Sequence, residues 1–175
     1  MAGGKHILGK AKRHIFGTAR VGEKGQIVIP KEARQIFGVQ VENDPWNAPW
    51  LSKTLASCVE LMAYRQREGD AAYEKRFYDE IEIATRLTRP HGVVIGASTE
   101  HFGGDGEMTQ VLRDAGAANL MGIEQAVGQE TFIRALQTYI AENAGGIGSL
   151  EALESALERE TGSDWSGYLA DMLAS

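Results

Sequence analysis

The side chains that could hold a metal ion gather around one glycine-rich segment, residues 98–107. Imidazole and carboxylate groups are common metal ligands, and this region offers four of them: His91, Glu100, His101 and Asp105. Nine residues separate the two histidines, and this spacing matches no ligand pattern typical of metal sites. We therefore interpret the segment as a solvated polar loop, and we predict no metal ligands and no cofactor.

The sequence motifs of the common enzyme classes are missing from these 175 residues. There is no H-E-x-x-H pair for zinc, no P-loop, no dinucleotide-binding glycine fingerprint and no C-x-x-C pair. There is also no G-x-S-x-G turn to expose a nucleophilic serine. Acidic pairs such as Glu80 and Glu82 are two residues apart, so on a helix they face different ways. From the residues alone we predict no catalytic residues and no enzyme.

Basic side chains concentrate near the N-terminus, although the formal net charge of the whole chain is −6. Residues 1–37 contain eight Lys and Arg and two acidic residues, whereas residues 38–175 contain ten and twenty-two. A short basic head on an acidic body is typical of a module that binds a polyanion. Lys and Arg on a rigid hairpin would displace counterions from DNA phosphates. The alternative is that these charges only solubilise a dimerisation hairpin.

The basic head is predicted to contain a hairpin followed by a short helix. Residues 17–22 and 26–30 are β-prone runs, and Gly25 can supply the positive φ of the turn between them. A helix over residues 31–37 would end at Gly38. One hairpin and two helical turns bury too little apolar surface to fold alone, so we predict a homodimer.

The sequence GTARVGEKGQIVIPKEARQIFGV, which begins at Gly17, resembles the first half of the swapped-hairpin domain of AbrB-like and MazE-like proteins. The resemblance implies that two chains interleave their hairpins into one dimeric β-barrel, whose basic face contacts double-stranded DNA. The positions that it implies for DNA binding are Arg20, Lys24, Lys31 and Arg34. The second half of that domain is missing, because the chain turns at Asp44 and Pro45 instead.

From Asp44 onward, apolar residues recur at helical spacing and predict an antiparallel array of helices. The breaks between them are predicted at Pro90, at the glycine-rich segment and at residues 145–148, and Ser149 and Asp164 are predicted helix caps. The predicted buried stripes are Leu51, Leu55, Val59 and Met62; Tyr73, Phe77, Ile81 and Ala84; Leu112, Gly116, Leu120, Ile123 and Val127; Phe132, Leu136, Tyr139 and Ile140; and Leu150, Leu153 and Leu157.

This helical body resembles the helical part of the thermolysin-like zinc aminopeptidases of the aminopeptidase N type. Residues 50–56, WLSKTLA, are similar to the family's W-L-x-E-G-x-A segment, and weaker similarities follow in the same order over about 125 residues. By this resemblance, the family's third zinc ligand falls at Lys53 and its conserved tyrosine falls at Arg113. An ammonium group repels a metal cation, so the resemblance implies a fold without the family's catalytic chemistry.

Together these observations predict an α+β protein with an N-terminal swapped β-hairpin, half of a dimeric barrel, followed by an antiparallel all-helical domain. The predicted parts are a basic tail at 1–16, the hairpin module at 17–43 and the helical domain at 44–175. The predicted function is a DNA-binding transcriptional regulator whose helical domain senses a peptide or protein ligand; the alternative is a dimeric scaffold that binds no DNA. A third alternative is that the two segments are not one natural gene product.

The sequence also predicts where the protein resides. No apolar run approaches the roughly 18 residues of a membrane span, so we predict no membrane contact. Cys58 is the single cysteine and cannot form an internal disulfide. Together these features predict a cytoplasmic protein.

Overall fold

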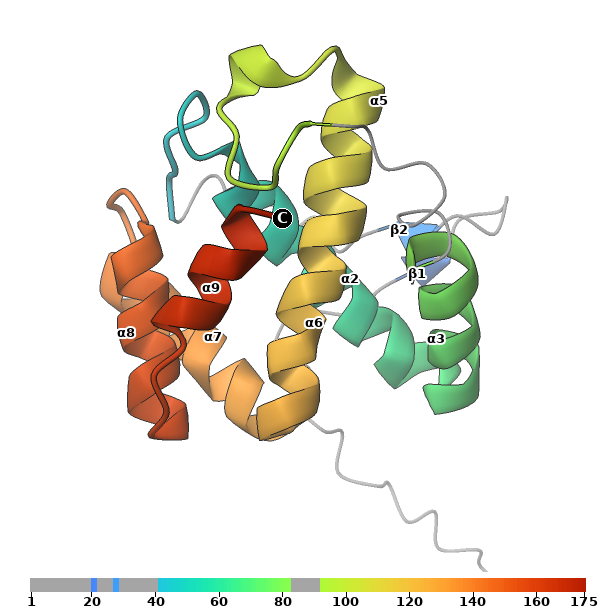
Figure 1. The fold of residues 1–175 in the computed structure, drawn as a ribbon. Coiled ribbons are helices and arrows are strands. Elements are labelled where there is room, and N and C mark those ends of the chain that lie inside the picture. The colour runs from blue at the N-terminus through green and yellow to red at the C-terminus, as the bar shows by residue number, and fades with distance from the viewer. Residues whose placement is uncertain (1–19, 22–26, 29–40, 83–91) are drawn as a thin grey trace, which may run out of the picture.

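The computed structural model describes residues 20–21, 27–28, 41–82 and 92–175. In these ranges the chain is mainly helical, and the helices pack around α6, which runs through the middle of the molecule (Figure 1). The longer helices are α2 (Pro49–Glu68), α6 (Gly116–Val127), α7 (Gln129–Asn143), α8 (Leu150–Thr161) and α9 (Ser166–Leu173). The shorter ones are α3 (Asp70–Arg76), η1 (Phe77–Glu82), η2 (Thr99–His101), α5 (Asp105–Met108) and η3 (Thr109–Ala115).

The predicted α+β class is wrong. Extended pairing in the described residues is limited to β1 (Arg20–Val21) against β2 (Ile27–Val28) and to one isolated bridge, Glu42 with Ile147. Two dipeptides cannot form a sheet that buries a core, since an isolated two-stranded hairpin is marginal even at full strand length. The described core, from Val41 onward, is built by helices instead. The predicted turn at Gly25, the helix over 31–37 and its cap at Gly38 lie outside the described residues.

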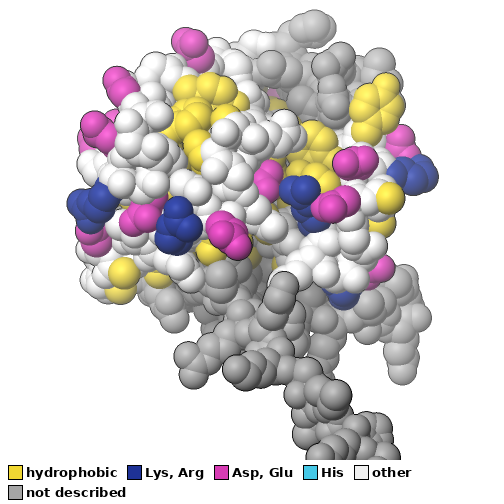
Figure 2. Space-filling model, turned by 90° about the horizontal axis from the view of Figure 1, so that it is seen from below, with side chains coloured by type: hydrophobic (Ala, Val, Ile, Leu, Met, Phe, Trp, Pro, Cys, Tyr) yellow, Lys and Arg dark blue, Asp and Glu magenta, His cyan; other side chains and the backbone are white. Residues whose placement is uncertain are grey.

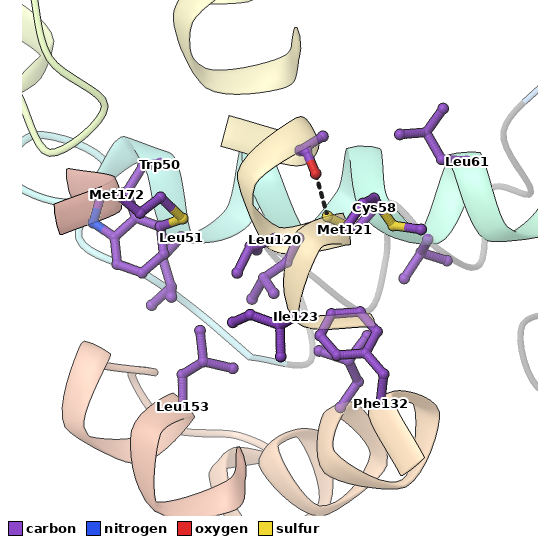
Figure 3. Close-up of a cluster of buried hydrophobic side chains, with 14 of the residues drawn as sticks. Trp50, Leu51, Cys58, Leu61, Leu120, Met121, Ile123, Phe132, Leu153 and Met172 are labelled. Carbon is purple, nitrogen blue, oxygen red and sulfur yellow. Dashed lines mark hydrogen bonds between the residues drawn. The ribbon is translucent and has the colours of Figure 1, made fainter. Parts of the chain in front are cut away.

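Helix α2 forms as the sequence predicts and packs on α6. Its predicted stripe is buried throughout, from Leu51 to Met62. The approach between the helices is close because Gly116 presents no side chain: a Cβ there would lie 2.6 Å from Thr54 Oγ1. Thr54 Oγ1 donates to the Leu112 carbonyl at 2.7 Å, and Figure 3 shows the similar bond from Cys58 beside Leu120 and Met121.

Segments α5, η3 and α6 form one long helix, because the backbone keeps helical angles through Thr109, Ala115 and Gly116. The predicted helix around Leu112 to Val127 is therefore confirmed. Segment η3, in the middle of the long helix, is a π-helix, and the apolar periodicity did not predict this. Such turns are rare and occur mainly as insertions in α-helices.

The C-terminal helices α7 and α8 form an antiparallel hairpin (Figure 1). Helix α9 contacts α6, where the Tyr168 hydroxyl donates to the Asn119 carbonyl at 2.7 Å. The predicted cap of α8 is confirmed, since Ser149 Oγ accepts a hydrogen bond from the Ala152 amide at 3.2 Å. Asp164 accepts from the Ser166 amide at 2.8 Å, at the start of α9. Of the described helices, none has the length and apolar character needed to cross a bilayer.

Candidate functional site

One face of α2 carries Lys53, the position at which the resemblance places the third zinc ligand. Lys53, Ser57 and Glu60 are spaced four and three residues apart, so they share this face. Arg113 of η3 reaches across to it: its Nε donates to Ser57 Oγ at 3.4 Å and its Nη2 donates to Glu60 Oε2 at 3.1 Å. Arg76 of α3 lies 3.5 Å from the other Glu60 oxygen. Glu60 thus joins three helical elements through one carboxylate.

A tyrosine ring extends this charged face toward the C-terminal end of α2. The guanidinium carbon of Arg76 lies 4.7 Å from the Tyr64 ring centroid, and that of Arg67 lies 5.7 Å from it. Both distances fall within the range of cation–π attraction. The α2 face, which we define as Lys53, Ser57, Glu60, Tyr64 and the arginines around them, is therefore tied together by charge and aromatic contacts.

The described part of this face does not fit a zinc ion. Lys53, at the position where the resemblance places a zinc ligand, is exposed and carries an ammonium group. The nearby carboxylate, Glu60, is already paired with two guanidinium groups. Within residues 41–82 and 92–175, no three His, Cys, Asp or Glu side chains come together in a way that could hold a metal. A catalytic zinc needs three protein ligands, and these residues do not supply them.

The residues of the predicted polar loop make local contacts around η2 and α5. His101 Nδ1 lies 2.7 Å from Ser98 Oγ, a local contact around η2, and the Gly103 amide donates to a Glu107 carboxylate oxygen. Glu100 lies in η2 and Asp105 begins α5. His91 lies outside the described residues.

The predicted DNA-binding residues are barely covered by the structure. Arg20 belongs to β1, whereas Lys24, Lys31 and Arg34 lie outside the described residues. On the face seen in Figure 2, acidic and basic side chains are interspersed, and the described residues show no broad basic patch there.

A buried carboxylate that the sequence analysis missed lies at the other side of α2. Glu124 of α6 is 2% exposed, and Arg65 Nη1 donates to its Oε1 at 3.2 Å. Arg65 Nε also binds Asp70 at 2.5 Å. Burial raises the pKa of Glu124 and the Arg65 guanidinium lowers it, while the nearby Asp70 raises it further. The sequence did indicate this burial, because Glu124 follows Leu120 by four residues and so falls on the predicted buried face.

The Glu124 cluster includes two more titratable groups that burial keeps neutral. Burial raises the pKa of Tyr73 to about 12, and the charge of Glu124 adds to the shift. Burial also raises the pKa of the Cys58 thiol well above its ordinary value. A neutral, buried thiol is a poor nucleophile. Cys58 is therefore suited to packing between helices rather than to covalent chemistry.

Replacement of Glu60 by alanine tests the role of the α2 face in stability. Since its side chain is 12% exposed, its loss removes charge-assisted bonds from Arg76 and Arg113 and should destabilise the fold by about 1–2 kcal/mol. Urea unfolding followed by circular dichroism measures this. The control is Glu142→Ala, whose pair with Arg159 is exposed and contributes about 0–1 kcal/mol. Equal losses in the two variants would contradict the prediction.

Comparison with known proteins identifies peptidases as relatives. No protein-family model matches the chain. Aminopeptidase M1-B from Oryza sativa subsp. japonica is 29% identical over 154 residues, which cover 85% of this chain and 17% of the rice protein. The crystal structure of a mutant M1 zinc metallopeptidase from Deinococcus radiodurans is 25% identical with a TM-score of 0.62, covering 81% of this chain and 31% of that one. The mutant bound to a Tyr-Ser-Ala substrate gives 24% and 0.60.

The helical region therefore resembles an M1 zinc aminopeptidase, as the sequence analysis inferred. The chain spans less than a third of the length of these relatives. The predicted function as a DNA-binding regulator is wrong, because the relatives are peptidases. The prediction of no enzyme conflicts with the same relatives and is also wrong. The comparisons give no support to an AbrB-like domain in residues 17–43.

Proposed function

We propose that this chain is the helical part of an M1-type zinc peptidase, and that the α2 face forms one wall of its peptide-binding cleft. The observation that carries the proposal is the agreement of fold with an M1 zinc metallopeptidase over 81% of the chain at 25% identity. The related structures include complexes with a Tyr-Ser-Ala substrate, L-tryptophan and L-arginine. Peptides with free amino ends are therefore the proposed substrate class.

We place the other zinc ligands on polypeptide outside the described residues, since Lys53 and its described neighbours do not fit the metal. When bound, zinc would activate a water molecule and polarise the scissile carbonyl. The part that this chain plays is to shape and position the cleft. Glu60, held between Arg76 and Arg113, fixes α2 against α3 and η3 and so keeps the wall in one place.

The test is to co-express the full chain with the two-thirds of the Deinococcus peptidase that it does not match. We expect a complex that hydrolyses Tyr-Ser-Ala faster than either polypeptide alone, measured by release of tyrosine. Failure to form a complex, or a complex that stays inactive in every variant below, would refute the proposal.

Lys53→Glu should strengthen zinc binding in that complex by about tenfold or more, because it replaces a repelling ammonium with a carboxylate at the position implied for a ligand. Hydrolysis should rise with it. Zinc titration with a competing chelator measures the affinity. The matched control is Lys53→Gln, which removes the positive charge without adding a ligand and should have a smaller effect. In the isolated chain, Lys53→Glu should create no zinc site, since one carboxylate cannot replace three ligands.

A further inference from the structure

Lys53 differs from the other cations of the helical body because no acidic side chain pairs with it. In residues 41–82 and 92–175, every other Lys and Arg forms an ion pair. Lys53 is exposed, and no described side chain bonds to it. The sequence places no Asp or Glu within four positions of it, so the neighbouring turns of α2 supply no counterion. This ammonium group is therefore available to an anion from outside the described chain.

Arg113 lies beside Lys53 across the contact between α2 and η3. Thr54, the residue after Lys53, donates to the Leu112 carbonyl at 2.7 Å, and Arg113 Nε donates to Ser57 Oγ at 3.4 Å. Lys53 and Ser57 are one helical turn apart on one face, where the Cβ atoms of neighbours stand about 5–6 Å apart. The flexible four-carbon stem of a lysine spans that distance. Both cations can therefore contact the same bound anion.

The guanidinium group of Arg113 has donors that the described residues do not bond. One edge, Nε with Nη2, donates to Ser57 and Glu60. No described residue bonds to Nη1, and the side chain is 40% exposed. A guanidinium group carries five N–H donors in a planar fork, and two parallel donors match the two oxygens of a carboxylate. The outer edge, Nη1 with Nη2, is therefore a donor pair suited to a carboxylate ligand.

Further cations continue the α2 face toward the C-terminal end of the helix. Arg76 and Arg67 stand over one aromatic ring, at 4.7 and 5.7 Å from its centroid. The acidic side chains paired with the cations of this face are Glu60 and Glu68, so the face keeps a net positive charge. From Lys53 to Arg67 the helix rises about 21 Å, which is the length of roughly six residues of extended peptide.

The charge of the whole body indicates which anion fits this face. Residues 38–175 contain ten Lys and Arg and twenty-two acidic residues. A long polyanion such as a nucleic acid would be repelled by that body, whereas a short acidic peptide would meet only the α2 face. A terminal carboxylate can occupy only one position along the row of cations. Acidic side chains at alternate positions of an extended peptide point the same way and can occupy several.

We infer that the α2 face binds peptides that carry acidic side chains. This inference rests on the proposed function, in which the α2 face is a wall of the peptide-binding cleft, and adds to it a substrate class. Arg113 donates to one carboxylate through its outer edge, and Lys53 neutralises the same group. The cations toward Arg67 attract a second acidic side chain of the peptide.

The experiment titrates the isotope-labelled full chain with three pentapeptides and follows binding by NMR, including the Nε–H signal of Arg113. Tyr-Glu-Ala-Glu-Ala-amide carries two acidic side chains, Tyr-Gln-Ala-Gln-Ala-amide carries none, and the free-acid form of the neutral peptide carries only a terminal carboxylate. The acidic peptide should bind about tenfold more tightly than either neutral peptide. The difference should shrink in about 0.5 M NaCl, because salt screens exposed charges.

Two variants locate the site. Lys53→Gln removes the charge of an exposed side chain and should weaken binding of the acidic peptide about threefold. Arg113→Lys keeps the charge but removes the planar fork, and should weaken the same binding about fivefold. The matched control is Lys75→Gln on α3, since Lys75 is 77% exposed and pairs with Asp79. This control should bind the acidic peptide as the unmodified chain does.

The outcomes separate the inference from the proposed function. If the acidic and neutral amides bind equally, or if Lys53→Gln and Arg113→Lys both keep the parent affinity, the inference is wrong, and the co-expression test is unaffected. If the neutral free acid binds as tightly as the acidic amide, the face recognises a terminal carboxylate and the inference is overturned. If the acidic peptide binds as expected while the co-expressed complex stays inactive, the proposed function fails and the acidic-peptide site is supported.

Discussion

Arg65→Ala should destabilise the protein by about 2–3 kcal/mol at neutral pH, below the full 3–5 kcal/mol of a completely buried pair. Arg65 is partly exposed, but its partner Glu124 has a side chain only 3% exposed. Without the guanidinium group, the Glu124 carboxylate would remain buried with no compensating charge. The loss should greatly exceed that of a surface pair. Urea unfolding at pH 7.5 measures it, with the exposed Arg159→Ala as control.

The same variant should show a pH dependence of known sign. Burial raises the folded-state pKa of Glu124 above its ordinary value of 4.5, and Arg65 opposes this shift. The folded state therefore holds the proton to higher pH than the unfolded state, so stability is lost as the pH rises through the folded-state pKa. Removal of Arg65 raises that pKa further and widens the window.

The deficit of Arg65→Ala should accordingly be smaller near pH 4, where the raised pKa of Glu124 favours its neutral form in the folded state, and larger at pH 7.5. The double variant Arg65→Ala/Glu124→Gln lacks the titrating group and should lose this pH dependence. A deficit that is equal at both pH values would show that Glu124 is not the group responsible.

Gly148→Ala should destabilise the fold by about 2–3 kcal/mol, the upper range for overpacking a filled core. A Cβ at this position would lie 1.9 Å from the Tyr139 hydroxyl oxygen and 2.8 Å from Val41 Cγ1. Tyr139 is 1% exposed and Val41 is 3% exposed, so neither side chain can move aside into solvent. Thermal unfolding should show a clearly lower midpoint.

The neighbouring Gly146→Ala is the matched control, since its Cβ would meet nothing closer than the Asn143 carbonyl oxygen at 3.5 Å. It should unfold nearly as the unmodified chain does. Adding Tyr139→Phe to Gly148→Ala removes the atom of closest approach and should recover part of the loss. Equal effects of the two glycine variants would contradict the packing explanation.

The positions of several helices follow from local patterns in the sequence. Leu51, Leu55 and Met62 recur at helical spacing and are all buried, and Ser149 caps α8 as expected. These features depend on residues three or four positions apart, so they can be recognised in the sequence alone. The same local reasoning led to the wrong function, because a charge asymmetry and a short hairpin motif say nothing about the larger fold to which a segment belongs.

Local patterns do not predict which side chains meet across the core; the packing of the helices sets these contacts. Arg65 with Glu124, Thr54 with Leu112 and Glu60 with Arg113 each join residues more than fifty positions apart. Likewise, Trp46 and Trp50 are four residues apart in one aromatic segment, yet Trp50 is 4% exposed and Trp46 is 68% exposed. The physical reason is that periodicity fixes which face of a helix is apolar, whereas the register and crossing of neighbouring helices depend on how their side chains interlock.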